Sequence, residues 1–197
     1  MMPRTAEITR KTKETDIAVF IDLDGKGESE IATGIGFFDH MLTALSKHSG
    51  IDMKITCKGD LEVDSHHSVE DVGIVLGQAL KEALGDKVGI RRYGDAKIPM
   101  DEAIGEAIID VSGRPFIVYN CDFKGDMMGQ MDTGLVEEFM RAFAFNAGIT
   151  LHISASYGTN DHHKAEAMFK ALARALRQAT EIDPRFEGQI VSTKGSL

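Results

Sequence analysis

The sequence predicts an α+β protein built from two similar halves. Segments of the first half recur in the same order about 96 to 100 positions later. Within each copy, short segments that alternate between apolar and polar residues are interspersed with segments of helical spacing. We therefore interpret the 197 residues as one domain made of two pseudo-repeats, 1–93 and 94–197.

The strongest internal match joins residues 66–83 (HHSVEDVGIVLGQALKEA) to residues 162–179 (HHKAEAMFKALARALRQA). In this pair 7 of 18 positions are identical. Three further pairs keep the same order: 49–56 with 147–154, 36–41 with 134–139, and 19–25 with 119–125. Chance likeness of two helices would not produce four matched segments in one order, so the repeat favours duplication.

The first half begins with residues 15–25, TDIAVFIDLDG, which alternate, contain β-branched residues and close on Asp-Gly. This pattern predicts a strand followed by a turn. Residues 37–50 have apolar side chains at helical spacing, and Gly50 can end that helix. Residues 51–59, IDMKITCKG, alternate with period two and predict a strand.

A second helix is predicted from His66, because apolar residues follow at steps of three and four. Asp64 or Ser65 can cap its start, and Gly85 can end it. We interpret residues 85–99 as the linker between the halves.

The second half contains an alternating strand at residues 149–156, ITLHISAS, and a helix over residues 162–179. Neither half has enough helix to cover both faces of a sheet. We therefore expect helices against antiparallel or mixed sheets, with close packing of the halves or oligomers.

The composition narrows the classes of function. The formal charge of −9 argues against nucleic-acid binding, although an acidic protein can still hold a small anion in a local basic pocket.

The two cysteines lack metal-ligand spacing, and a chain with so few cysteines suits a reducing compartment. The N-terminal residues lack the apolar stretch of a signal peptide, and no apolar run approaches the ~20 residues of a membrane span. We expect a cytoplasmic protein without membrane partners.

The His-His-x-x-Glu pattern at His66, His67 and Glu70 is the main functional signal. Residues three or four apart share a helix face, so either histidine can join the glutamate on one metal ion. The alternative is a solvated helix start. Duplication favours metal binding, since the trio recurs as His162, His163 and Glu166 while most of the surrounding residues differ.

Mixed imidazole and carboxylate ligands suit divalent Mn, Fe or Zn, and two copies predict a two-metal site. His40, on a separate predicted helix, is a candidate further ligand; the alternative is a partly buried histidine with satisfied hydrogen bonds. Basic residues at Arg92, Arg114, Lys170 and Lys194 are each most often surface residues, but the Ser-Thr-Lys-Gly tail suits phosphate.

Several long motifs carry a resemblance to a known family. They are GIGFFDHML, DSHHSVED, LGQAL, GIRRYG, PMDEA, DVSGRP, YGTNDHHKAEAMFKALARALRQA and VSTKGSL. Together these motifs resemble the imidazoleglycerol-phosphate dehydratase family of histidine biosynthesis, and the match runs from about residue 5 to the C-terminus.

The resemblance implies a lyase that dehydrates D-erythro-imidazole-glycerol phosphate to imidazole-acetol phosphate. It implies two Mn²⁺ ions per active site, acting as Lewis acids on the two ring nitrogens of the substrate. It also implies two half-domains that resemble the second domain of ribosomal protein S5, with helices between two four-stranded sheets. Family members form homo-oligomers of 24 subunits with active sites between subunits.

The resemblance also assigns residues by their match to the family motifs. The metal ligands it implies are His40, His66, His67, Glu70, His162, His163 and Glu166. The substrate-binding residues it implies are Glu14, His48, Arg92, Arg114, Lys170, Ser192, Thr193 and Lys194, with Glu14 also as the acid–base catalyst. We expect His67 with Glu70, and His163 with Glu166, to serve one ion each, with His66 and His162 reaching the other ion.

One position departs from the family pattern. The repeat places Glu138 opposite His40, where many relatives have a histidine. A carboxylate can also bind manganese, so we include Glu138 among the candidate ligands.

Two other functions stay open at this point. A two-metal hydrolase of a phosphorylated metabolite would share the metals and the phosphate site, and would be recognised by release of inorganic phosphate. An RNA-binding module is suggested only by the ribosomal fold likeness, and the net charge argues against it.

Overall fold

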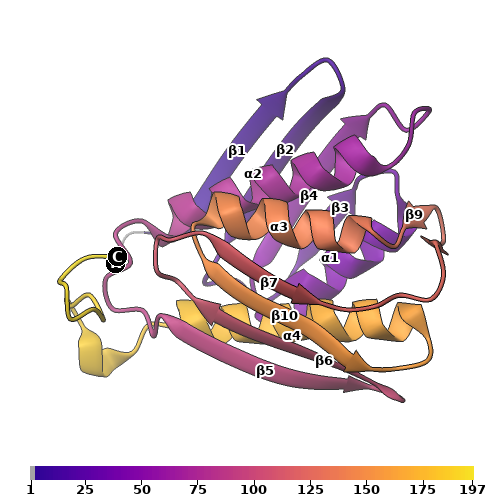
Figure 1. The fold of residues 1–197 in the computed structure, drawn as a ribbon. Coiled ribbons are helices and arrows are strands. Elements are labelled where there is room, and N and C mark those ends of the chain that lie inside the picture. Colours follow the sequence, from indigo (N-terminus) through magenta and orange to yellow (C-terminus); the bar gives the residue numbers. More distant parts are fainter. Residues whose placement is uncertain (1–2) are drawn as a thin grey trace.

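The computed structural model describes residues 3–197 and has three layers, with the α-helices lying between two four-stranded sheets (Figure 1). The first sheet has the order β1-β2-β4-β3, and its strands are β1 (Thr5–Lys11), β2 (Thr15–Asp22), β3 (Ser29–Ala32) and β4 (Asp52–Gly59). The second sheet has the order β5-β6-β10-β7, and its strands are β5 (Tyr93–Met100), β6 (Ala103–Asp110), β7 (Phe116–Asn120) and β10 (Thr150–Tyr157).

The two sheets have the same topology. In each, three neighbouring strands are antiparallel and the fourth, β3 or β7, joins the edge in parallel. Each half also contributes two helices: α1 (Gly36–Ser49) and α2 (His66–Leu84) in the first, α3 (Leu135–Ala147) and α4 (Asp161–Thr180) in the second. The predicted fold of two duplicated α+β halves is therefore confirmed.

Two expectations from the sequence are wrong in detail. The match of residues 19–25 with 119–125 fails, because β2 is a central antiparallel strand whose counterpart is β6, whereas 119–125 begin in the parallel edge strand β7. The linker assigned to residues 85–99 contains most of β5. Its charged residues and Pro99 are not typical of a strand, which is why the sequence predicts a linker here. Both are tolerated because β5 is an edge strand.

The helices pair across the halves, since α2 packs against α3 and α1 packs against α4. The approach of α2 to α3 is close at Gly73 and Gly77. A Cβ added at Gly77 would lie 2.6 Å from the carbonyl oxygen of Phe143 on α3. The two glycines thus allow the helix backbones to approach within a distance that larger residues would prevent.

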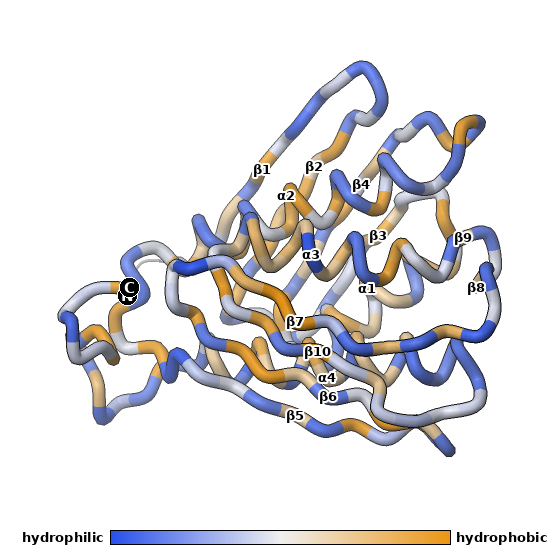
Figure 2. Tube along the Cα trace, viewed as in Figure 1, coloured by the Kyte–Doolittle hydropathy of each residue, from blue (hydrophilic) through white to orange (hydrophobic). Residues whose placement is uncertain are grey.

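The apolar side chains meet in one core between the sheets and helices. Hydrophobic residues recur along both the strands and the helices in Figure 2. At its centre the rings of Phe38 and Phe139 lie edge to face, and Phe139 stacks on Phe143 and Phe169. This core fixes the relative positions of all four helices.

The helix boundaries follow the predicted signals. Asp64 accepts a hydrogen bond from the backbone N–H of His66 at 2.7 Å, and Asn160 accepts from His162 at the start of α4. Gly50 ends α1 in the left-handed conformation, at φ 79°, and Gly85 follows α2. The remaining elements are the hairpin of β8 (Met127–Met128) and β9 (Met131–Asp132) and a 3-10 turn at Pro184–Phe186. Within residues 3–197, the helices are too short or too polar to cross a membrane.

Candidate active site

Helix α1 of the first half and helix α4 of the second half bring together His40, His162 and Glu166. The Nε2 atom of His40 lies 3.3 Å from Oε2 of Glu166, and Nε2 of His162 lies 3.1 Å from the same oxygen. One ligand atom from each residue falls within 4.8 Å of the others. Two imidazoles and a carboxylate in this arrangement form a set that suits a divalent transition metal.

The carboxylate of Glu166 is ionised at neutral pH. Burial raises its pKa, but hydrogen bonds and charge from Lys170, with further bonds from His40 and His162, outweigh burial and hold the pKa at about 2. The Nζ of Lys170 lies 2.6 Å from Oε1, which leaves Oε2 facing the two histidines. The site thus presents an anionic oxygen to any cation bound there.

His163 turns away from this cluster. Its Nδ1 lies 2.7 Å from Oε2 of Glu102, and its Nε2 lies 3.8 Å from a carboxylate oxygen of Asp101. These acidic residues form the two-residue turn between β5 and β6, in which Asp101 has φ 47°. The single chain therefore groups Glu166 with His162, whereas the sequence led us to expect His163.

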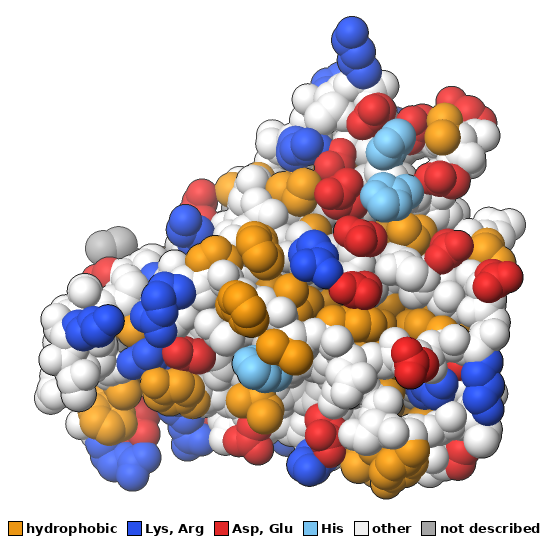
Figure 3. Space-filling model, viewed as in Figure 1, with side chains coloured by type: hydrophobic (Ala, Val, Ile, Leu, Met, Phe, Trp, Pro, Cys, Tyr) orange, Lys and Arg blue, Asp and Glu red, His pale blue; other side chains and the backbone are white. Residues whose placement is uncertain are grey.

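The first half repeats this arrangement at the start of α2. The Nε2 of His66 lies 3.7 Å from Oε2 of Glu70, four residues on. The Nδ1 of His67 lies 3.1 Å from Oδ2 of Asp60, and its Nε2 lies 3.9 Å from Oε1 of Glu14. The side chains of His66 and Glu70 are 45% and 43% exposed, and histidine and acidic side chains lie together on one part of the surface in Figure 3.

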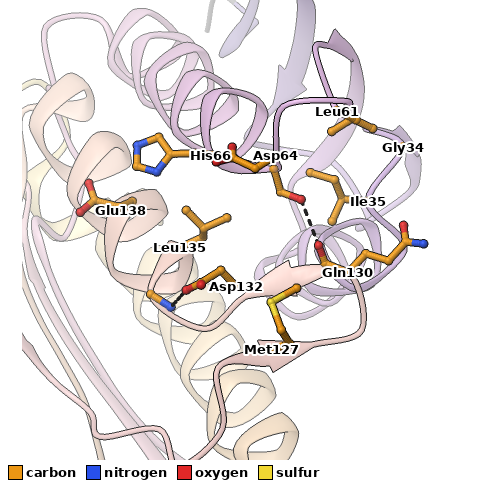
Figure 4. Close-up of a pocket in the computed structure, with 12 residues that line it drawn as sticks. Gly34, Ile35, Leu61, Asp64, His66, Met127, Gln130, Asp132, Leu135 and Glu138 are labelled. Atoms are coloured by element: carbon orange, nitrogen blue, oxygen red, sulfur yellow. Dashed lines mark hydrogen bonds between the residues drawn. The ribbon is translucent and has the colours of Figure 1, made fainter.

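A pocket of about 770 Å³ opens between the starts of α2 and α3. His66 and Glu138 extend toward it from these two helices (Figure 4). Glu138 thus lies beside the first His-His pair, as His40 lies beside the second. The place that the repeat predicts for Glu138 agrees with the structure, while its role as a ligand stays a prediction.

Of the residues expected to hold phosphate, all except Lys170 form a second group near the C-terminus. The guanidinium of Arg92 donates to Asp110 at 2.8 Å and to the carbonyl oxygen of Val191 at 2.8 Å. The hydrogen bond to Asp110 raises the pKa of Arg92, so its charge is retained. Arg114 lies 3.7 Å from Asp110 and is 65% exposed. The tail that follows Val191 carries the half-buried Ser192 and the exposed Thr193 and Lys194.

Strand β5 separates these two groups. Arg92 directly precedes the strand and Asp101 directly follows it. Eight extended residues span about 25 Å, which exceeds the reach of a small phosphate ester. One chain therefore does not bring the residues of the tail end and the histidine cluster of the second half onto the same small molecule.

Lys170 and His48 lie apart from the Arg92 group. Lys170 pairs with Glu166 beside the histidine cluster. The pKa of His48 is lowered by burial and then by the charges of Lys170 and Arg174 on α4. His48 itself is exposed on α1, the helix that packs against α4.

Comparison with known proteins identifies the family of this chain. The family model for imidazoleglycerol-phosphate dehydratase matches residues 33–176, which include both His-His pairs and both glutamates. The chain belongs to the imidazoleglycerol-phosphate dehydratase family. It is accordingly a hydro-lyase that dehydrates imidazole-glycerol phosphate in histidine biosynthesis.

Relatives within this family match nearly the whole chain. The imidazoleglycerol-phosphate dehydratase of Gluconacetobacter diazotrophicus is 60% identical over 194 residues, which is 98% of each protein. The crystal structure of the Staphylococcus aureus dehydratase superposes with a TM-score of 0.83 at 41% identity, covering 91% of this chain and 99% of that one. The Pyrococcus furiosus enzyme superposes with a TM-score of 0.80, also at 41% identity, covering 96% and 100%.

Sequence reasoning missed the acidic residues that contact the second histidine of each pair. Asp60 directly follows β4, where a carboxylate is ordinary, and nothing in the sequence marks it. Glu102 lies within PMDEA, one of the motifs that carry the resemblance to the dehydratase family. The two-residue turn of that motif was the available signal, because it aims adjacent carboxylates at the start of α4.

Proposed function

We propose that the dehydratase activity depends on two Mn²⁺ ions per active site, bound by the duplicated histidine and glutamate sets. The grouping of His40, His162 and Glu166 carries this proposal, because three ligand atoms of suitable chemistry already lie within 4.8 Å of one another. When bound, the metals would supply Lewis acidity to the nitrogens of the imidazole ring of the substrate. The other proposed ligands are His66, His67, Glu70, Glu138 and His163.

The remaining site residues would bind and orient the substrate. Glu14, on the turn between β1 and β2, is 53% exposed and free to move a proton at the carbon next to the ring. Arg92, Arg114 and Lys194 would hold the phosphate, with Ser192 and Thr193 as hydroxyl donors. Lys170 would orient Glu166, and His48 would line the adjacent wall.

We infer that each active site lies between subunits. The separation of Arg92 from the histidine cluster of the second half along β5 supports this, because a second chain is needed to complete the site. In the first half, within the described residues, fewer than three ligand atoms approach one another as closely as those of His40, His162 and Glu166. A partner chain can supply the missing ligands.

The outer face of the second sheet supports assembly. Tyr93, Ile108, Phe116 and Val118, here called the second-sheet patch, are each at least 41% exposed on this face. His152 lies between Ile108 and Val118 across the strands. The hydrophobic side chains gather around one histidine in Figure 3. An apolar face of this kind suits burial against another copy, and assembly into 24 subunits stays a prediction.

The test is an assay of the purified protein with imidazole-glycerol phosphate, before and after EDTA treatment and after addition of Mn²⁺. We expect activity to be lost with the metal and restored by it. Turnover that survives complete metal removal would contradict the proposal. A cytoplasmic location stays a prediction, testable by fractionation of the source cells.

A further inference from the structure

Each half contains a carboxylate that is hydrogen-bonded to the Nδ1 atom of one histidine. Neither carboxylate is among the proposed metal ligands or substrate-binding residues. In the first half Asp60 lies 3.1 Å from Nδ1 of His67. In the second half Glu102 lies 2.7 Å from Nδ1 of His163. An ionised carboxylate only accepts hydrogen bonds, so in each ring Nδ1 must carry the proton and donate it.

The two carboxylates occupy different places in the fold. Asp60 directly follows β4, whereas Glu102 lies in the turn between β5 and β6. The counterpart of β4 is β10, so the equivalent of Asp60 would follow Tyr157, far along the chain from Glu102. Duplication alone therefore does not explain why the same nitrogen has a carboxylate partner twice. Two different chain positions supply one contact, which indicates that the contact itself matters.

The other ring nitrogen is available in both histidines. The Nε2 of His67 has Glu14 at 3.9 Å, and the Nε2 of His163 has Asp101 at 3.8 Å. Both distances exceed hydrogen-bond range. With the proton held on Nδ1, the lone pair of the neutral ring is on Nε2. This is the tautomer that a metal ion needs.

We propose that Asp60 and Glu102 are positioning residues that fix His67 and His163 in the Nδ1-protonated tautomer, with Nε2 presented to the metal. This inference rests on the proposed function, in which both histidines are ligands. A carboxylate behind a ligating histidine orients the ring and raises its basicity, and its loss typically lowers metal affinity about 10- to 100-fold.

Glu102 permits a sharp test, because its two oxygens have different partners. Oε1 accepts from the backbone N–H groups of Thr159 and Asn160, each at 2.8 Å, while Oε2 accepts from His163. In Glu102→Gln the amide oxygen can keep the backbone bonds. The amide nitrogen then faces His163 and donates to Nδ1, which forces the ring proton onto Nε2. The turn stays intact while the tautomer is reversed.

Asp60 provides the second variant. Both of its oxygens lie within 3.2 Å of Nδ1 of His67. Its backbone N–H donates to the carbonyl oxygen of Glu14, and Asp60→Asn does not alter that bond. Glu106→Gln is the matched control, since Glu106 lies on β6 next to the same turn as Glu102 but pairs with Lys97.

The experiment is equilibrium dialysis of the intact, metal-free protein against Mn²⁺, with bound metal measured by mass spectrometry and assembly followed by light scattering. We expect Glu102→Gln and Asp60→Asn each to weaken the binding of one of the two Mn²⁺ ions about 10- to 100-fold. The Mn²⁺ affinity of Glu106→Gln should equal that of the wild type. Affinities within about twofold of wild type in both variants would overturn the inference.

Further variants separate this inference from the proposed function. His67→Ala and His163→Ala remove the proposed ligands themselves. If these variants bind Mn²⁺ as wild type does, the ligand assignment fails and the inference fails with it. If they lose Mn²⁺ while Asp60→Asn and Glu102→Gln retain it, the ligand assignment stands and only the positioning role is rejected.

Discussion

The Nε2 atom of His40 lies 3.3 Å from Oε2 of Glu166, although the two residues belong to different halves and are 126 positions apart. The contact exists because α1 packs against α4, so one half supplies a histidine beside the His-His pair of the other. The relation between His66 and Glu138 in the first pocket is its counterpart. Each candidate metal set therefore depends on both halves being folded together.

Glu14→Gln should reduce turnover by at least about 100-fold, because an amide cannot exchange a proton with the substrate. Steady-state kinetics and metal analysis should be done on the same sample, since Mn²⁺ content should stay near the wild-type value. Glu7→Gln, on the neighbouring strand of the same hairpin, is the control. Unchanged turnover would exclude Glu14 as the acid–base group.

Glu138→Ala should lower the bound Mn²⁺, whereas Glu138→His should retain metal, because imidazole and carboxylate are both competent ligands. The histidine variant should also shift preference toward metals that favour nitrogen. Mass spectrometry after dialysis against mixed Mn²⁺ and Zn²⁺ measures both effects. Glu137→Ala is the control, since that neighbour pairs with Arg141 instead. Full metal content in Glu138→Ala would remove this residue from the ligand set.

The affinity for Mn²⁺ should depend on the protonation of His67. The hydrogen bond to Asp60 raises the pKa of His67. Metal binds only the neutral ring, so affinity is full above this raised pKa and is lost as the pH falls through it. In Asp60→Asn the pKa returns toward about 6.5, so the loss should move to lower pH. Binding curves between about pH 5 and 8 measure the midpoint. A midpoint equal to that of wild type would contradict this explanation.

Ile108→Asp combined with Val118→Asp should weaken assembly, since two charges would be placed in the second-sheet patch. Light scattering should show smaller species, and activity should fall with them because the proposed active site between subunits would no longer be complete. Thr56→Asp places a charge on an exposed position of the first sheet and should have little effect. An unchanged mass would show that this face is not an interface.

Gly77→Ala should lower the free energy of unfolding by about 1–3 kcal/mol, because the added Cβ overlaps the backbone of α3. Chemical denaturation of the metal-free protein measures the change. Gly36→Ala provides the comparison, since a Cβ there meets no atom within 4 Å. Equal free energies of unfolding in the two variants would show that α2 and α3 can move apart to admit the Cβ without loss of stability.

The sequence predicts the fold because its strongest signals are local and occur twice. The helix starting at His66 and the strand over residues 51–59 have clear periodicity, and both are confirmed. Strand β5 was missed because an edge strand need not be apolar. Its charged residues resemble a linker until the pairing with β6 is known.

The candidate site was predictable in its residue types but not in its grouping. The duplicated His-His-x-x-Glu pattern points to His162, His163 and Glu166, but it led us to pair Glu166 with His163, whereas the chain groups it with His162. That α1 rather than another element lies beside them depends on long-range helix packing, which leaves no local pattern in the sequence. The same is true of Asp60, whose contact with His67 arises from the position of β4 relative to α2.

The length of β5 has a genetic consequence. Because Arg92 precedes this strand and the acidic turn that holds His163 follows it, damage at one end leaves the other end of the same chain intact. With each active site between subunits, as proposed above, two inactive alleles, one carrying Arg92→Ala and the other His163→Ala, would complement each other when co-expressed. In a hybrid particle, a fraction of the sites would combine the undamaged end of each parent, and growth without histidine would return.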